Sequence, residues 1–241
     1  MAKTLSDCRS LLRSYLDENS PSDWTNAELN TLINQRYHRV YTAIVNVYED
    51  YYSTTSTFNT VANQQEYTTS DNLPSDIYKI RRVEINYDTT ITNGAPLRAL
   101  PLQNIDAVRR DLGQTNSGAK IFTNPNYYFR GTTLGFIPIP DKAGTNAIKM
   151  WYIKTISDLS SDSTALDIPY PDRYFHLVVE GATSDALRFG QQDSPEADKF
   201  EAKFVSGILL MQEELEDRLA EETKSVLDIS GEFLDMGSLS Y

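Results

Sequence analysis

Few side chains in this sequence are suited to catalysis or metal binding. The two histidines, His38 and His176, each fall within a helical pattern, and the single cysteine, Cys8, lies on an apolar helix stripe. A two-histidine metal site would need both residues from distant helices, so structural or solvated histidines are the favoured interpretation. Cys8 is expected to be a buried small hydrophobe. One cysteine also excludes an intramolecular disulfide and every cysteine zinc site.

Acidic residues are the other candidates for chemistry. Asp158, Asp162 and Asp167 share one loop, but their spacing misses the calcium-loop pattern and lacks its glycine and terminal glutamate, so turn and cap roles are expected. A second set could be imagined as the paired carboxylates of a hydrolase: Glu213, Glu214, Glu216, Asp217, Glu221 and Glu222. These six fall on one predicted helix, whereas two catalytic carboxylates need different environments facing one cleft.

Cofactor and nucleotide motifs are also missing. The sequence contains no glycine-rich dinucleotide or phosphate loop, no nucleophile elbow and no zinc-protease helix motif. The residues therefore predict no catalytic centre, no metal site and no cofactor.

The charge balance is strongly acidic and uneven. The formal net charge is −12, and the segment from Asp193 to Asp235 holds thirteen acidic against four basic residues. Binding to phosphate backbones is driven by Lys and Arg, which release counterions. The chain is thus a poor candidate for binding DNA, although it could lie beside DNA.

Helical periodicity marks both ends of the chain. A first helix is expected from Thr4 to Asp17, and a second begins at a capping box of Thr25 and Glu28 and keeps one apolar face as far as Tyr51. Near the C-terminus one helix ends at Gly190. Another starts at Ser194-Pro195 and runs for about 30 residues.

The segment between these helices has β-type patterns. Alternating residues predict strands around Val83 to Tyr87 and from Ala147 to Ile156, and Arg130-Gly131-Thr132 joins a predicted hairpin. A turn at Asn93-Gly94 and a short helix from Leu102 to Leu112 are also expected.

The predicted fold class is therefore α+β, mainly α, because the longest helices each need a partner face. Residues 1–52 and 168–228 are predicted to form a helical bundle of long helices from both chain ends. Residues 53–167 are predicted to form a β-rich insertion with one short helix, and residues 229–241 an extended C-terminal arm. The arm has no helical period but carries five large apolar residues: Phe233, Leu234, Met236, Leu239 and Tyr241.

Neither export nor membrane insertion is expected. The sequence has no apolar run of about 18 residues, and no apolar segment follows Lys3 as a signal peptide would require. The chain has 15 tyrosines, a residue type common where protein meets protein. Ordinary packing of the β-rich insertion explains them equally well.

Several motifs occur in a fixed order along most of the chain. They are Trp24-Thr25-Asn26-Ala27-Glu28-Leu29 leading to Ile33-Asn34, Asn124-Pro125-Asn126-Tyr127-Tyr128, Gly135-Phe136-Ile137-Pro138-Ile139-Pro140-Asp141, Met150-Trp151-Tyr152, and Ile168-Pro169 before two helices, from Leu177 to Gly190 and from Ala197 to Leu219. Together they resemble the head-tail connector (adaptor) proteins of tailed bacteriophages, which sit beneath the portal ring. The β-rich middle is longer than in the smallest of these proteins.

This resemblance implies a structural virion protein without enzyme activity or cofactor. It implies a ring of twelve copies under the portal protein, which extends the DNA channel and holds a tail or nozzle protein. DNA would pass through without specific binding, and no membrane would be involved. The protein would be made and assembled in the cytoplasm of the host bacterium and end at the portal vertex of the virion. Two alternatives stay open: a tail-associated cell-wall hydrolase and a monomeric regulatory binding module.

Two expectations about sites follow. Part of the acidic run from Glu213 to Glu222 is expected to face the DNA channel, because acidic walls repel phosphates; an outer solvated face is the alternative. The C-terminal arm is expected to dock on the portal or on a neighbouring subunit, because a free tail has no use for five large apolar side chains. Folding back onto its own bundle is the alternative.

Overall fold

The fold is α+β and consists of two compact units. In the computed structural model, the described residues are 3–18, 23–85, 95–96, 98–99, 126–137, 139–140, 142–190 and 194–222. One unit contains the residues up to Tyr48 and those from Asp158 onward, and the other runs from Glu49 to Ser157. The first is helical and the second is β-rich.

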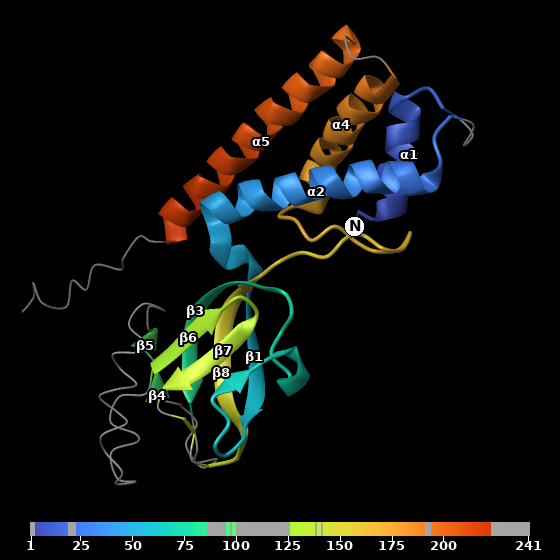
Figure 1. Cartoon of the computed structure of the whole chain (residues 1–241). Coiled ribbons are helices and arrows are strands. Elements are labelled where there is room, and N and C mark those ends of the chain that lie inside the picture. The colour runs from blue at the N-terminus through green and yellow to red at the C-terminus, as the bar shows by residue number, and fades with distance from the viewer. Residues whose placement is uncertain are drawn as a thin grey trace, which may run out of the picture. The chain divides into compact units, whose positions relative to one another are not determined.

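The helical unit has four α-helices among its described residues: α1 (Leu5–Tyr15), α2 (Asn26–Tyr48), α4 (Pro171–Gly190) and α5 (Pro195–Glu222). Figure 1 shows α4 and α5 side by side, with α2 running across them. Each helix turns an apolar stripe inward, as the 3.6-residue period requires. Fully buried members of this core include Leu5, Leu12, Leu29, Ile33, Ile44, Val178 and Met211.

The two N-terminal helices begin at side-chain caps. The backbone N–H of Asp7 donates to Thr4 Oγ1 at 3.3 Å, and the backbone N–H of Thr4 donates back to the Asp7 carboxylate at 2.9 Å. Thr25 and Glu28 exchange the same pair of bonds at 3.3 and 2.9 Å. Both boxes satisfy backbone donors that a helix start leaves unpaired. The predicted helix starts are thus confirmed.

The second helix ends one turn earlier than its periodicity predicts. After Tyr48 the chain tightens into a 3₁₀ turn, η1 (Glu49–Tyr52), and then enters the strand β1 (Ser53–Thr60). In this turn the carboxylates of Glu49 and Asp50 accept hydrogen bonds from Lys79 at 2.9 Å and from Arg81 at 2.9 Å. The turn therefore ties the start of the β-rich unit to its own third strand.

The β-rich unit contains two four-stranded sheets. The first has the order β1-β8-β3-β4, all antiparallel, and its strands are β1 (Ser53–Thr60), β8 (Gly144–Lys154), β3 (Ile77–Ile85) and β4 (Ala95–Pro96). The second has the order β2-β7-β6-β5, with β5 parallel to β6, and its strands are β2 (Glu66–Tyr67), β7 (Thr133–Ile137), β6 (Asn126–Arg130) and β5 (Arg98–Ala99). Residues of both sheets share one core, including Phe58, Tyr67, Val83, Phe136, Ile148 and Met150.

The hairpin predicted around Gly131 is confirmed as β6 and β7. Gly131 has a φ of 59°, a left-handed conformation that glycine adopts without steric cost. On β7, a Cβ added to Gly135 would lie 2.1 Å from Cζ of Tyr128, its cross-strand partner. The missing side chain of Gly135 therefore makes room for a tyrosine that is 2% exposed.

Most described tyrosines pack inside the two units. Eight are buried: Tyr37, Tyr41, Tyr52, Tyr67, Tyr127, Tyr128, Tyr152 and Tyr174. Tyr51, Tyr78 and Tyr170 are exposed. Ordinary packing thus accounts for most of the tyrosine content, and three tyrosines lie at the surface.

Some sequence predictions lie outside the described residues. They are the turn at Asn93-Gly94, the short helix from Leu102 to Leu112, the end of the strand at Tyr87, and the arm 229–241. Among the helices that the structure describes, none combines the length and the hydropathy needed to cross a bilayer.

Candidate interaction surface

The helix α5 carries most of the residues that the sequence singles out. It starts where expected, with Ser194 Oγ accepting the backbone N–H of Ala197 at 3.3 Å and Pro195 in the first helical position. Pro at this position costs no hydrogen bond, because that N–H would be unpaired anyway. Ala197, Phe204, Met211 and Leu215 form its buried stripe. The stripe orients the helix and leaves its opposite side exposed.

A buried charge cluster links α5 to α2 and α4. Arg36 on α2 is 2% exposed, and its guanidinium donates to both Asp185 carboxylate oxygens at 2.5 Å and to Glu201 Oε1 at 3.1 Å. The guanidinium also lies over the Phe204 ring, 4.9 Å from its centroid. Despite its burial, this pairing with Asp185 and Glu201 raises the pKa of Arg36, so the side chain stays charged.

Close packing around this cluster depends on a glycine in α4. A Cβ at Gly181 would lie 2.7 Å from Cδ of Arg36 and 3.1 Å from Cδ2 of Phe204. Only a residue without a side chain leaves room for both groups. Gly181 thus marks the point on α4 where the arginine side chain passes between the helices.

The predicted channel-facing acids divide into three groups. Glu213, Glu216 and Asp217 are exposed on the second half of α5, whereas Glu214 is only partly exposed. Glu221 and Glu222 belong to the last turn of α5, and the structure does not describe their side chains. The exposed three are spaced so that they lie on one side of the helix. Among the described residues, no contact assigns that side to a channel.

Glu214 has partners inside the helical unit. Its carboxylate forms an ion pair with Arg173 and accepts a hydrogen bond from the Tyr174 hydroxyl. Burial, together with this carboxylate, raises the pKa of Tyr174 to about 12. Glu214 therefore joins α5 to α4 and is not a free surface acid.

An open groove lies beside this ion pair, between the start of α4 and α5. It is lined by Tyr170, Pro171, Asp172, Arg173, Glu214, Asp217 and Arg218. Tyr170 has a φ of 49°, unusual for a residue with a side chain, and the Arg218 guanidinium lies 4.9 Å above its ring. The lining mixes both charge signs, so it does not select a cation or an anion.

An exposed apolar face on α5 is a feature that the sequence reasoning missed. Val205, Leu209 and Leu210 are 49%, 61% and 60% exposed; these three residues are called the apolar face of α5 below. The signal in the sequence was the doublet Leu209-Leu210, which adds an apolar position outside the buried stripe. Large apolar side chains with this exposure on a long helix are typical of contact surfaces.

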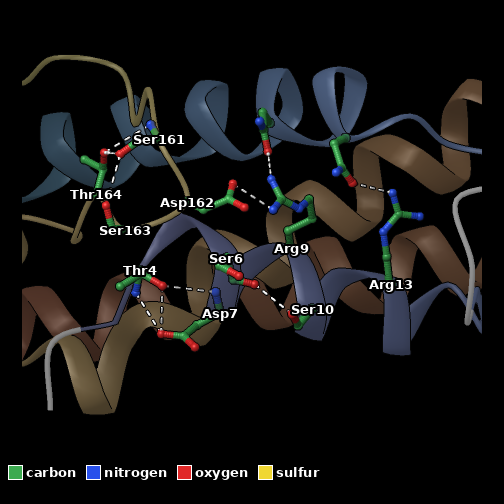
Figure 2. Close-up of polar contacts among 12 residues, drawn as sticks. Thr4, Ser6, Asp7, Arg9, Ser10, Arg13, Ser161, Asp162, Ser163 and Thr164 are labelled. Atoms are coloured by element: carbon green, nitrogen blue, oxygen red, sulfur yellow. Dashed lines mark hydrogen bonds and ion pairs between the residues drawn. The ribbon is translucent and has the colours of Figure 1, made fainter.

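The loop before α4 has structural partners of its own. Figure 2 shows the Arg9 guanidinium reaching the Asp162 carboxylate, at 2.8 Å, between α1 and this loop. The backbone N–H of Leu5 donates to the Thr164 carbonyl at 3.0 Å, and Asp158 lies 2.7 Å from Nε2 of His38. The backbone N–H of Asp167 donates to the Tyr37 hydroxyl at 2.9 Å. The three aspartates thus stand at separate contacts and do not converge on one point.

The remaining chemical candidates also have structural surroundings. Cys8 is fully buried, and burial raises the pKa of its thiol to about 12, as expected for a small hydrophobe. Among the residues that the structure describes, no group of three or more His, Cys, Asp or Glu side chains could hold a metal ion. The predicted arm residues Phe233, Leu234, Met236, Leu239 and Tyr241 lie outside the described part of the chain.

Comparison with known proteins identifies the family. No curated protein matches the chain. The family model of the SU10 adaptor protein matches residues 3–225, a span that includes all four described helices and both sheets. The resemblance to phage adaptors that the ordered motifs suggest is thereby confirmed at the level of the family. The chain belongs to the SU10 adaptor protein family, a family of structural adaptor proteins of bacteriophages.

Proposed function

We propose that this protein is a head-tail connector. In this role it forms a ring, of twelve copies, beneath the portal protein at the portal vertex of the virion. The ring extends the DNA channel and provides the attachment site for a tail or nozzle protein. DNA passes through it without specific binding.

The observation that carries this proposal is the adaptor family match over residues 3–225. An adaptor family implies a place in the virion and association with other capsid or tail proteins, and a structural family favours a role without catalysis. The net charge of −12 and the exposed acids of α5 add support, because an acidic wall does not hold DNA. The exposed apolar face of α5 supplies a surface for such contacts.

The ring is tested on assembled particles. Electron cryo-microscopy of particles that contain the portal is expected to show this chain as a closed ring at the portal vertex. The same chain, mixed with the portal protein, should elute as a complex of ring size. A monomer bound at another site, or a chain absent from the vertex, would refute the connector assignment.

We also propose that Glu213, Glu216 and Asp217, with Glu214, Glu221 and Glu222 nearby, line the channel. Changing the first three to lysine would place cations along the DNA path, and we expect slower ejection from particles that still assemble. The matched control changes the same three to glutamine and should give an intermediate rate. Equal ejection rates in all three particles would assign these acids to an outer solvated face.

The arm 229–241 is proposed to dock outside its own bundle. Deleting the residues from Gly231 onward should leave the melting temperature of the monomer unchanged and abolish assembly onto the portal. Each large apolar side chain of the arm gains about 1.5 to 3 kcal/mol on burial, so five of them can decide assembly. A lower melting temperature of the truncated monomer would instead indicate an arm that folds back.

A further inference from the structure

We infer that the outer edge of β1 is the docking site for an extended segment of the tail or nozzle protein, called the tail protein below. This segment adds a fifth strand to the sheet β1-β8-β3-β4. The inference rests on the proposed connector function and names the surface that receives the tail protein.

The strand β1 lies at the edge of its sheet (Figure 1). Its Cα partners from Ser53 to Phe58 all belong to β8, and the strand order places no strand on its other side. Every second residue of an antiparallel edge strand directs its backbone N–H and C=O away from the sheet. Among the residues that the structure describes, none forms a hydrogen bond with these outward groups between Ser53 and Phe58.

The exposure of inward-facing residues on β1 also indicates an open edge. Thr54 and Ser56 lie opposite Tyr152 and Met150 of β8, so the four side chains share the face of the sheet that carries the core. Tyr152 is 5% exposed and Met150 is fully buried, whereas Thr54 and Ser56 are only partly buried. This difference is expected where no strand lies beyond β1.

The open part of the edge ends at Phe58. This side chain is 2% exposed and packs against Tyr67, with 5.8 Å between the ring centroids. The register with β8 becomes irregular directly after it. The opening thus extends from Ser53 to Thr57 and has the length of a short strand, about five residues.

The strand β1 lacks the features by which proteins prevent pairing at a sheet edge. Those features are charged side chains, proline and very short edge strands. From Ser53 to Gln65 the sequence contains no charged residue, no proline and no glycine. The other edge strands that the structure describes, β4, β2 and β5, have two residues each, and β4 ends in Pro96. Of the described edges, β1 is therefore the one suited to receive a strand.

Ring symmetry favours another protein as the source of that strand. Because the other described edges are so short, the sheets of a second copy could pair with β1 only through their own β1. Two copies joined by the same edge are related by a two-fold axis, whereas neighbours in a ring of twelve are not.

The C-terminal arm of another copy is also a poor strand for this edge. Its centre, Glu232 to Met236, lies between Gly231 and Gly237 and includes Asp235. Glycine and acidic residues are disfavoured in strands. The arm is in addition the proposed contact to the portal, so the edge of β1 is assigned to the tail protein.

The neighbouring positions on β1 define the sequence type of the incoming strand. Its residues beside Thr54 and Ser56 face the rim of the core and should be apolar. Those beside Ser53, Thr55 and Thr57 face solvent, where threonine and other β-branched residues fit. Proline is excluded, because it cannot donate to the ladder. We therefore expect an alternating apolar and polar segment of about five residues.

Two lysine variants at adjacent positions test the inference. In Ser56→Lys the new side chain faces inward and reaches water past the open edge, but an added strand would bury its charge. Rings should form on the portal as before, whereas the concentration of tails, purified from virions, that fills half of the rings should rise about tenfold or more. Thr55→Lys stays in solvent in both states, so it should bind tails normally.

Hydrogen exchange of the unmodified chain gives a second measurement, which does not depend on the folding of a variant. In portal-bound rings without tails, every second amide from Ser53 to Thr57 should exchange rapidly. These amides should exchange about tenfold more slowly, or less, once purified tails are bound. Full protection of all five amides before tails are added would show that the edge is not open.

A cross-link identifies the occupant of the edge. Thr55→Cys is labelled with a benzophenone reagent, to which the fully buried Cys8 should not react, and assembled virions are irradiated. We expect a cross-link to the tail protein. A cross-link to the portal protein or to a second copy of this chain would overturn the inference.

The remaining outcomes separate this inference from the proposed function. Normal tail binding by Ser56→Lys, or exchange in β1 that tails do not slow, would reject the docking site and leave the connector function intact. Failure of the unmodified chain to form rings on the portal, or of those rings to bind tails, would reject the proposed function and the inference with it.

Discussion

Replacement of Arg36 by methionine should destabilise the helical unit more than any other single loss of charge in α2. Arg36 is 2% exposed and holds Asp185 and Glu201 together. Methionine keeps a side chain of similar length but removes all its hydrogen bonds. The two carboxylates of α4 and α5 would then face each other without a cation.

The expected loss of stability follows from the burial of the ion pairs of Arg36. Removing one partner of a buried ion pair costs about 3 to 5 kcal/mol, because a charge stays buried without compensation. The carboxylate side chains are 28% and 25% exposed, so water compensates in part, and the lower end of about 3 kcal/mol applies. In a protein of this size that corresponds to a drop in melting temperature of about 6 to 12 °C.

Urea unfolding followed by far-ultraviolet circular dichroism measures the helical unit most directly. The matched control is Arg39→Met, an exposed arginine on the same helix, which should change stability by less than about 0.5 kcal/mol. Adding Asp185→Asn and Glu201→Gln to Arg36→Met should restore most of the loss, since the orphaned charges are then gone. If Arg36→Met costs no more than the control, the cluster does not hold these helices together.

Two further changes test other parts of the structure. The hydrogen bonds from Thr25 hold the pKa of Glu28 below its ordinary value, so this carboxylate stabilises the fold above pH 4.5 and loses that effect as the pH falls through the lowered pKa. Glu28→Gln should therefore have a lower melting temperature than the unmodified chain at neutral pH. This difference in melting temperature should shrink in acid. Equal differences at both pH values would contradict this reasoning. Gly135→Ala should displace Tyr128 and cost about 1 to 3 kcal/mol, seen as earlier unfolding of the β-rich unit by Trp151 fluorescence in chains that also carry Trp24→Phe. The control Gly131→Asn, in an open left-handed turn, should cost at most about 1 kcal/mol, and a larger loss there than at Gly135 would contradict the packing argument.

Local signals in the sequence predicted the helix starts and the hairpin. The capping boxes of Thr4 and Thr25, the Ser194-Pro195 start and the turn at Gly131 all depend on residues within a few positions of one another. Such features are set by local sterics and hydrogen bonds, so their spacing is enough to find them. The acids of α5 were found for the same reason, by their clustering, although clustering did not reveal that Glu214 pairs with Arg173.

Contacts between distant segments could not be read in the same way. Arg36 meets Asp185 and Glu201, which are 149 and 165 residues away, and nothing in the spacing of the three predicts the pairing. The hint was a charged residue, Arg36, on an apolar helix face between Ile33 and Val40.

The contacts of the loop from Asp158 to Asp167 could not be read from local spacing either. The sequence groups it with the β-rich insertion, while its contacts run to α1 and α2. The predicted domain limits at residues 52 and 168 stay a prediction.

The split of the helical unit along the chain has a consequence during synthesis. Its first two helices leave the ribosome before the β-rich unit, and their partners α4 and α5 follow only after it. The ribosome adds the 122 residues from Glu49 to Tyr170 in about 6 to 24 s, during which the apolar stripes of α1 and α2 lack the two later helices as partners. Nascent chains stalled before Pro171 should thus be cut by protease in α1 and α2. A host chaperone that shields these stripes would then act on the growing chain and not on the finished protein.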